Sequence, residues 1–255
     1  MAKKKKQQTQ QDVRDIIAST PLFADLSAPQ QDELATAVQV MHHKNGHLFF
    51  QQGDKLSHIQ FILEGQLKTF CSDDDGNEKI IQLLKQGDIS FETAVFLDIP
   101  SSLSAQAVSD CTTLSIPSPL IRRFIHRNTD FANKMIQYIS HNFQTLVKQI
   151  EVISLKAPYE RVAYYLLHEF VKQGSAHKDF ELPYKKSLLA NKLGMTPETF
   201  SRALHELRRY GITIHKRQVH MTSLTSLCDF CDPDQAANCP KYTPSDCPTI
   251  GDDNL

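Results

Sequence analysis

Long apolar runs are missing from this 255-residue chain. Although 40% of the residues are hydrophobic, no uninterrupted stretch approaches the ~18–20 apolar residues that a membrane-spanning helix needs. The opening segment, residues 1–8, is polar and basic and lacks the apolar stretch of a secretory signal. We therefore expect a cytoplasmic protein with no membrane partner. Its cysteines should stay reduced and serve metal binding or redox sensing rather than disulfides.

The residue patterns of an enzyme are also missing. No side chains stand in a nucleophile–base arrangement, and no glycine-rich loop of the kind that cradles a nucleotide phosphate is present. We therefore predict a protein that is not an enzyme. One alternative, a thiol-redox or ferredoxin-like enzyme with an ancillary DNA-binding module, has only the cysteines of residues 228–255 in its favour.

Basic and acidic residues are unevenly placed, although the formal net charge is only −1. Residues 184–220 hold eight Lys or Arg against two Glu, a net charge of +6. Residues 228–255 hold one Lys against six Asp, a net charge of −5. A basic module suits phosphate groups, and an acidic segment beside it suggests a different role. Residues 1–12, with their run of lysines, are expected to be a disordered basic tail.

Short β-rich segments alternate with glycine-containing turns between residues 46 and 116. The expected strands are His47–Gln51, Ile59–Leu63, Leu67–Phe70, Lys79–Leu84 and Leu114–Ile116. The turns between them carry Gly-Asp, Glu-Gly or Asp-Gly pairs, and glycine supplies the positive φ angle that tight turns demand. Two short helices, Val13–Ala18 and Asp32–Val40, are expected before the strands. Residues 13–128 are therefore predicted to form a small antiparallel barrel or roll.

A long helix is predicted over residues 129–157, where it ends near Pro158. Its apolar residues are spaced in steps of three and four, which is the heptad pattern of a helix seam. The seam residues, which we expect to form a dimer interface, are Ile136, Ile139, Phe143, Leu146, Ile150 and Ile153. The alternative is that this helix docks on its own domain; the regular spacing favours a parallel homodimer.

The pattern of residues 158–227 is typical of a winged helix-turn-helix. The expected elements are a helix at Glu160–Lys172, a strand at Phe180–Leu182, helices at Lys185–Leu193 and Pro197–Tyr210, and a hairpin at Ile212–Thr222. Gly194 stands where the tight turn between the two helices is needed, and Thr196 and Pro197 suit the start of the second helix. The predicted fold class is α+β.

The helix that begins at Pro197 carries two opposite stripes. Its apolar residues recur at i, i+3, i+4 and i+7 and should face the core, while polar residues with the same spacing should face outward. Arg can donate two hydrogen bonds to guanine, and Glu can accept one from cytosine. The predicted DNA contacts, including two at the hairpin tip, are Thr196, Glu198, Thr199, Ser201, Arg202, His205, Lys216 and Arg217. The alternative is an ordinary solvated face, in which Glu198 and Arg202 are only an i, i+4 ion pair.

Between Leu22 and Leu227 the sequence resembles the CRP/FNR family of bacterial transcription regulators. The motifs that carry the resemblance are Pro21-Leu22-Phe23, Phe49 to Asp54, Phe61 to Gly65, Gly87-Asp88 and Leu182 to Leu204. The last of these looks particularly like the DNR/NNR branch, whose members respond to nitric oxide or low oxygen. The resemblance implies that residues 13–128 are a cyclic-nucleotide-binding-like β-roll that acts as a sensor domain. It also implies a homodimer and two recognition helices on double-stranded DNA. The Glu198-x-x-Ser201-Arg202 pattern implies TTGAT-type half-sites, and RNA polymerase is the further expected partner.

Two ligand sites known in that family do not match. The family's cyclic-phosphate cassette contains a glycine and an arginine, but the matching positions here are Phe91-Glu92-Thr93 and Ser101-Ser102. Without the arginine a phosphate would lose a strong charge-assisted hydrogen bond, so cAMP is not an expected ligand. The cysteine ligands of the oxygen-sensing branch are absent as well, because the chain has no cysteine before Cys71 and carries Ser115 at the matching position in the roll.

Four cysteines follow the hairpin with the spacing Cys228-x2-Cys231-x7-Cys239-x7-Cys247. We expect them to bind an iron–sulfur cluster, 4Fe–4S or 2Fe–2S, because two of them precede proline as ferredoxin ligands do. Zinc is an alternative, although its sites usually show two closely spaced pairs; Asp229 or Asp232 could replace one thiolate. A segment without bound metal is a further alternative. In another interpretation haem in the roll receives the signal, although no histidine is marked as its ligand.

Overall fold

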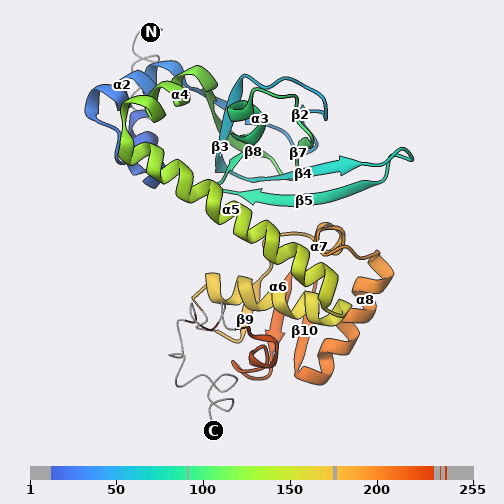
Figure 1. Ribbon diagram of the computed structural model, residues 1–255. Helices are drawn as coiled ribbons and strands as arrows, with labels where there is room; N and C mark the ends of the chain where they lie inside the picture. Colours follow the sequence, from blue (N-terminus) through green and yellow to red (C-terminus); the bar gives the residue numbers. More distant parts are fainter. Residues whose placement is uncertain (1–12, 91, 175–176, 233–235, 237–238, 240–255) are drawn as a thin grey trace, which may run out of the picture. The chain divides into compact units, whose positions relative to one another are not determined.

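The computed structural model describes residues 13–90, 92–174, 177–232, 236 and 239 (Figure 1). The chain divides into two compact units, residues 1–145 and 146–255. The basic tail expected at residues 1–12 and Cys247 lie outside the described residues. Among those that are described, no helix combines the length and apolar character needed to cross a membrane.

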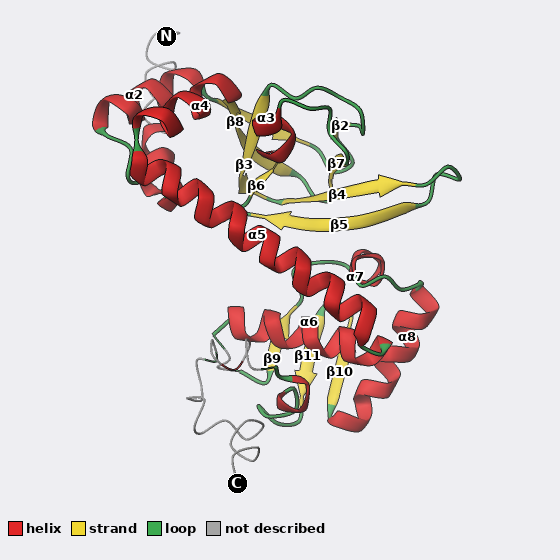
Figure 2. Cartoon of the chain, in the orientation of Figure 1, coloured by secondary structure: helices red, strands yellow, loops and turns green. Residues whose placement is uncertain are grey.

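Two four-stranded antiparallel sheets form the roll of the first unit, which confirms the predicted architecture (Figure 2). One sheet has the order β1-β8-β3-β6 and the other β2-β7-β4-β5. Their bounds are β1 (Gln39–His43), β2 (Leu48–Phe50), β3 (His58–Glu64), β4 (Gln66–Ser72), β5 (Glu78–Lys85), β6 (Ile89–Ser90), β7 (Ser104–Ala107) and β8 (Cys111–Pro117). The apolar interior of the roll contains Ile62, Leu67, Leu84 and Ala107, and Cys111 packs among them as a small apolar side chain.

Helices α2 and α4 and the start of α5 lie together at one end of the roll (Figure 1). Residues 13–19 are helical, and the other helical elements of this unit are η1 (Pro21–Phe23), α2 (Ala28–Ala37), α3 (Glu92–Leu97), α4 (Ser118–Arg127) and the first part of α5 (Thr129–Leu155). Their apolar side chains and the outer face of the β1-β8-β3-β6 sheet share a second core. Phe23, Phe61, Phe124 and Phe131 lie at its centre, with ring centroids 5.8 to 6.5 Å apart in three pairs.

The second predicted helix was misplaced. The observed helix is α2 (Ala28–Ala37) rather than Asp32–Val40. It begins there because the Gln30 side chain accepts a hydrogen bond from the backbone N–H of Ser27. Val38 already has extended backbone angles, and the next residues join β1. The short elements β1, β6, β7, α3 and α4 were not expected at all.

Gly65, in the turn between β3 and β4, has φ of +84° and lies against the turn before β8. A Cβ atom at this position would be 2.3 Å from the carbonyl oxygen of Asp110 and 2.5 Å from the Cβ of Cys111. Gly65→Ala should therefore destabilise the protein by about 2 kcal/mol or more, from backbone strain and overpacking together. Chemical denaturation would measure the loss. Gly76→Ala is the control, since its φ is also positive but nothing lies within 4 Å of its Cβ position; equal losses in the two variants would contradict the packing argument.

The second unit contains the end of α5, three further helices and a three-stranded antiparallel sheet of order β10-β11-β9 (Figure 2). Its elements are α6 (Pro158–Lys172), β9 (Asp179–Glu181), α7 (Lys186–Lys192), α8 (Pro197–Glu206), η2 (Leu207–Tyr210), β10 (Ile212–His215), β11 (Gln218–Met221) and η3 (Cys228–Phe230). The predicted winged helix-turn-helix is confirmed. The α-helix predicted to reach Tyr210 ends at Glu206, where a 3-10 turn takes over and Gly211, with φ of +73°, ends the helical path.

Candidate functional site

The helix-turn-helix consists of α7, a tight turn and α8. Gly194 has φ of +67° in that turn, and its N–H donates to the carbonyl of Asn191 at 3.0 Å. The next residue, Met195, donates to the carbonyl of Ala190 at 2.9 Å. Phe200 and Ala203 of α8 are buried, so this face of the helix packs on its own domain. The opposite face is therefore held outward by the core packing.

Thr196 caps α8 at its N-terminus. Its Oγ1 accepts a hydrogen bond from the backbone N–H of Thr199 at 3.2 Å, which satisfies one of the donors that a helix start leaves unpaired. Thr196→Ala should lower the free energy of unfolding by about 1 kcal/mol, as measured by urea denaturation. Thr196→Ser keeps the hydroxyl and should stay close to the wild type. If the Ala and Ser variants proved equally stable, the cap would not contribute.

The predicted reading face of α8 is open to solvent. Glu198, Ser201, Arg202 and His205 are all exposed, and Arg202 donates to the hydroxyl of Thr199 at 3.3 Å. Hydrogen bonds from its own backbone N–H and from Thr196, together with the charge of Arg202, lower the pKa of Glu198. A charged Glu198 can only accept hydrogen bonds, which is the state needed to accept one from a cytosine amino group.

Arg209 joins this face although the sequence pattern did not single it out. A hollow of about 280 Å³ is lined by Arg202, His205, Glu206 and Arg209. The strict i, i+3, i+4, i+7 count stopped at His205, and the 3-10 turn that carries Arg209 departs from α-helical periodicity. In the sequence, Arg209 contributed only to the net charge of +6 over residues 184–220.

The wing is the hairpin of β10 and β11. Lys216 is exposed in its turn, with φ of +53°. Arg217 is exposed too, but its guanidinium pairs with the carboxylate of Glu181 on β9. The two tip residues were predicted as equivalent contacts, and the structure shows that Arg217 already has a partner within the protein.

Helix α5 carries a row of exposed apolar side chains. Ile136 is 62% exposed, and Phe143 and Ile150 are each 66% exposed. Ile139 is exposed as well, whereas Leu146 is half-buried. Ile153 differs from the other predicted seam residues. It is half-buried, and its side chain lies 3.5 Å from the Cβ position of Gly194 in the helix-turn-helix.

Two residues outside the predicted seam extend the exposed row. Val147 is 48% exposed and Leu155 is 79% exposed. Other apolar side chains of α5, including Met135 and Val152, are buried in their own units, so only part of the helix surface is available to a partner. An exposed apolar row of this length on a helix marks an interaction surface.

Two hydrogen bonds of one side chain connect α5 to the roll within the first unit. The hydroxyl of Tyr138 accepts a hydrogen bond from the backbone N–H of Ile89 at 2.7 Å and donates to its carbonyl at 3.0 Å. This fixes β6 just before the stretch that corresponds to the family's phosphate cassette. At the other cassette position, Ser101-Ser102, the Ser101 hydroxyl donates to the carbonyl of Leu103 at 2.8 Å. Phe91 lies outside the described residues.

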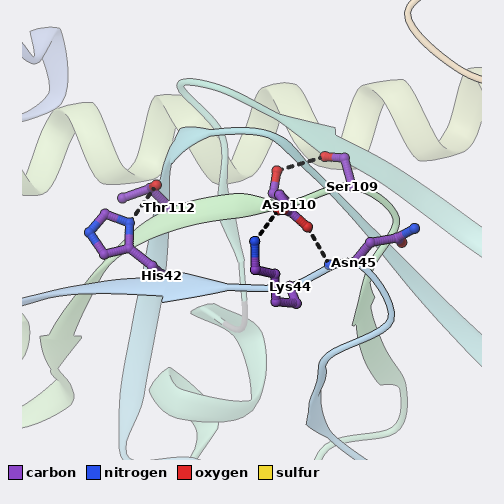
Figure 3. Close-up of polar contacts among 6 residues, drawn as sticks. All are labelled: His42, Lys44, Asn45, Ser109, Asp110 and Thr112. Carbon is purple, nitrogen blue, oxygen red and sulfur yellow. Dashed lines mark hydrogen bonds and ion pairs between the residues drawn. The ribbon is translucent and has the colours of Figure 1, made fainter.

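A polar network ties the turn between β1 and β2 to the turn before β8 (Figure 3). Lys44 Nζ donates to Asp110 Oδ2 at 2.7 Å, and the N–H of Asn45 donates to Asp110 Oδ1 at 2.9 Å. The hydrogen bond from Lys44 is the main cause that lowers the pKa of Asp110. His42 contacts Thr112 at 3.0 Å beside this network. No local sequence pattern indicated this network, whose contacts join the two turns.

Cys228 and Cys231 lie at the start of η3 and just after it, where the N–H of Cys231 donates to the carbonyl of Cys228 at 3.0 Å. Both are half-buried, as is Cys239. Cys247 lies outside the described residues. In the described part of the chain, no three His, Cys, Asp or Glu side chains are grouped closely enough to hold a metal ion. The thiol donors suit iron–sulfur or zinc chemistry, and the first two, Cys228 and Cys231, share one turn.

Comparisons with known proteins agree with this geometry. Residues 40–128 match the family described as "Cyclic nucleotide-binding domain", and residues 160–230 match "Crp-like helix-turn-helix domain". The "Fumarate and nitrate reduction regulatory protein" of Yersinia pestis is 27% identical over 66% of this chain and 68% of its own length. The "Transcriptional activator protein anr" of Pseudomonas aeruginosa is 24% identical over 72% and 77%. The structure of FixK2 from Bradyrhizobium japonicum superposes with a TM-score of 0.67 over 77% of this chain and 98% of that one, at 18% identity.

A cyclic-nucleotide-binding-type roll, a long helix and a Crp-like helix-turn-helix together define a DNA-binding transcription regulator. The chain belongs to the CRP/FNR family.

Proposed function

We propose that the protein is a homodimer that binds a near-palindromic DNA site and changes transcription in response to oxygen, nitric oxide or redox state. The observation that carries the DNA part is the exposed Glu198–Ser201–Arg202 face on a capped helix whose other face is buried. Relatives with the printed names "Fumarate and nitrate reduction regulatory protein" and "Anaerobic regulatory protein" support a signal connected with anaerobic conditions. We propose that the protein acts in the cytoplasm.

Each predicted contact has a distinct role on DNA. Arg202 would donate to guanine O6 and N7, Glu198 would accept from cytosine, and Ser201 adapts to either base edge, in a TTGAT-type half-site. Thr196 and Thr199 stand at the helix N-terminus, where hydroxyl and backbone N–H groups suit phosphates. His205 extends the reading face. Lys216 at the wing tip would contact the backbone, and Arg217 would do so only by leaving Glu181.

The second subunit would pack against the exposed row on α5. This row forms an apolar stripe that is exposed to water in a single subunit, and its residues are Ile136, Ile139, Phe143 and Ile150. Parallel pairing of two copies would bury the same stripe on both. Leu146 is half-buried and would contribute less. Ile153 would support the helix-turn-helix rather than the partner, because its side chain lies 3.5 Å from the point that a Cβ atom would occupy at Gly194. A contact with RNA polymerase would convert DNA binding into activation.

For the signal we propose an iron–sulfur cluster held by Cys228, Cys231, Cys239 and Cys247. Such a cluster would supply a centre that reacts with oxygen, nitric oxide or electrons. Support comes from four thiols within 20 residues that directly follow the wing and from the turn that carries the first two. The second candidate is haem in the roll, with zinc or nothing on the cysteines. The ring cluster of His43, His47 and Phe49, with centroids 4.4 to 5.1 Å apart, is the observation that favours testing it.

Anaerobic purification without chelators, followed by iron, sulfide, zinc and haem analysis per subunit, distinguishes these candidates. We expect iron and sulfide in equal amounts, lost when all four cysteines are changed to Ser, together with loss of the promoter response. Cys71→Ser is the matched control, since Cys71 is half-buried on β4, remote in sequence from the four. A variant without the four cysteines that still responded normally would exclude the cysteine sensor, and haem at one per subunit would favour the second candidate.

A further inference from the structure

Residues 227–232, which we name the docking segment, are packed against the DNA-binding domain. Leu227 is 1% exposed. The ring of Phe230 lies edge-on to two tyrosines, with centroids 4.9 Å from Tyr210 and 6.2 Å from Tyr159. Such edge-to-face pairs add stabilisation beyond their apolar burial. The segment with the first two cysteines is therefore fixed to the body of this unit.

The partners of Phe230 connect it to the reading helix. Tyr210 is the last residue of η2, the 3-10 turn that directly continues α8. Tyr159 belongs to the first turn of α6, and its ring stacks on Tyr210 at 6.1 Å. The three rings thus form one cluster made by the end of the reading helix, the start of α6 and the cysteine turn. Displacing Phe230 would remove a support of Tyr210.

An ion pair makes a second attachment. Lys148 Nζ on α5 lies 2.8 Å from Asp232 Oδ2, and the side chain of Asp232 is only 15% exposed. Lys148 also pairs with Glu151 at 3.1 Å. When one partner of a partly buried, hydrogen-bonded ion pair is removed, the structure is destabilised, because the remaining charge has lost its partner. Lys148 lies on α5, two residues before Ile150. Its ion pair with Asp232 therefore attaches the docking segment to the helix that carries the exposed apolar row.

We propose that the docking segment positions the recognition helix and transmits the chemical state of Cys228 and Cys231 to it. Phe230 and Asp232 are the positioning residues, and the two cysteines lie within two residues of them. A change at the thiols that displaces η3 would release Tyr210 and Lys148 together. This inference rests on the proposed DNA reading by α8, and it holds whichever group the cysteines bind.

The test measures affinity for a TTGAT-type palindrome before and after alkylation of the full-length protein with iodoacetamide. All proteins carry Cys71→Ser, Cys239→Ser and Cys247→Ser, so that the reagent acts on Cys228 and Cys231. Cys111 is protected because it is 4% exposed and burial raises the pKa of its thiol. We expect alkylation to weaken specific binding about tenfold, within the usual range of coupling between sites. Phe230→Ala and Asp232→Asn should already bind about tenfold more weakly and change less than about twofold on alkylation.

Glu64→Gln is the charge control, because Glu64 is exposed at the end of β3, outside the docking segment, and the variant loses the same charge; it should behave as the parent protein. Wild-type affinity in Phe230→Ala, or an equal effect of alkylation on that variant and its parent, would overturn the proposal. If no protein prefers the palindrome over random DNA, the proposed DNA reading itself has failed, and both proposals fall together.

A fluorescence measurement separates displacement from unfolding. The chain contains no tryptophan, so Phe230→Trp introduces a single reporter in the ring cluster. We expect its emission to move to longer wavelength on alkylation, while the circular dichroism of the protein stays unchanged. An emission that does not move, although the cysteines are alkylated, would show that the segment stays docked and would contradict transmission through it.

Discussion

Phe143→Glu is expected to convert the dimer to a monomer and to weaken binding to a two-half-site DNA by about 100-fold or more. Phe143 is 66% exposed in the middle of the apolar row on α5, so in a parallel dimer it would face its own copy. Two glutamates there would be buried beside each other without cations, which the interface cannot tolerate. A monomer loses the second half-site, and avidity from two linked sites is worth about 10²–10⁴ in affinity.

Sedimentation velocity and titration of a labelled duplex would check both effects. Gln144→Glu is the control, because it introduces the same charge at the exposed neighbouring position, outside the predicted seam. That variant should remain a dimer with unchanged affinity. A Phe143→Glu protein that is still dimeric and binds the palindrome as before would place the interface elsewhere.

Arg202→Ala is expected to reduce specific binding by about 1–3 kcal/mol and to relax the preference at the guanine of the half-site. Arg202 is exposed in the centre of the reading face, and its guanidinium can donate two parallel hydrogen bonds to one base. Competition binding against duplexes with each base substituted in turn measures the preference directly.

Lys216→Ala provides the contrast. A phosphate contact should weaken all sequences alike and reduce the slope of log affinity against log salt by about one. If Arg202→Ala weakened all sequences equally and kept its preference for TTGAT-type sites, Arg202 would be a backbone contact and the assignment of the reading face would be wrong.

The elements that the sequence predicted correctly are those with strong local signals. The 3.6-residue periodicity of α5, and the Thr196-Pro197 start of α8, depend on residues close in the chain. The missed strands lacked such signals. For example, β7 has the sequence Ser-Ala-Gln-Ala, without a β-branched or aromatic residue, and it is a strand because β2 and β4 lie on either side of it. Tertiary pairing decided its structure, and a local pattern cannot show that.

The candidate site divides in the same way. Helix geometry alone places Glu198, Ser201 and Arg202 on one face, so their spacing in the sequence was sufficient to predict that they lie together. The pairing of Arg217 with Glu181 and of Lys148 with Asp232 joins residues far apart in the chain, which one sequence without relatives does not reveal. Ile153 fits the heptad but packs against the turn at Gly194, because a repeat cannot show which partner an apolar residue meets.

The central claim is that a dimer reads two half-sites, and one titration tests it most directly. Full-length protein would be titrated at fixed salt with a duplex of two TTGAT-type half-sites about 10 base pairs apart, centre to centre, and with the same duplex after one half-site is scrambled. We predict that the intact palindrome binds about 100-fold more tightly, with two subunits per duplex. Equal affinity for both duplexes, or one subunit per duplex, would contradict the account.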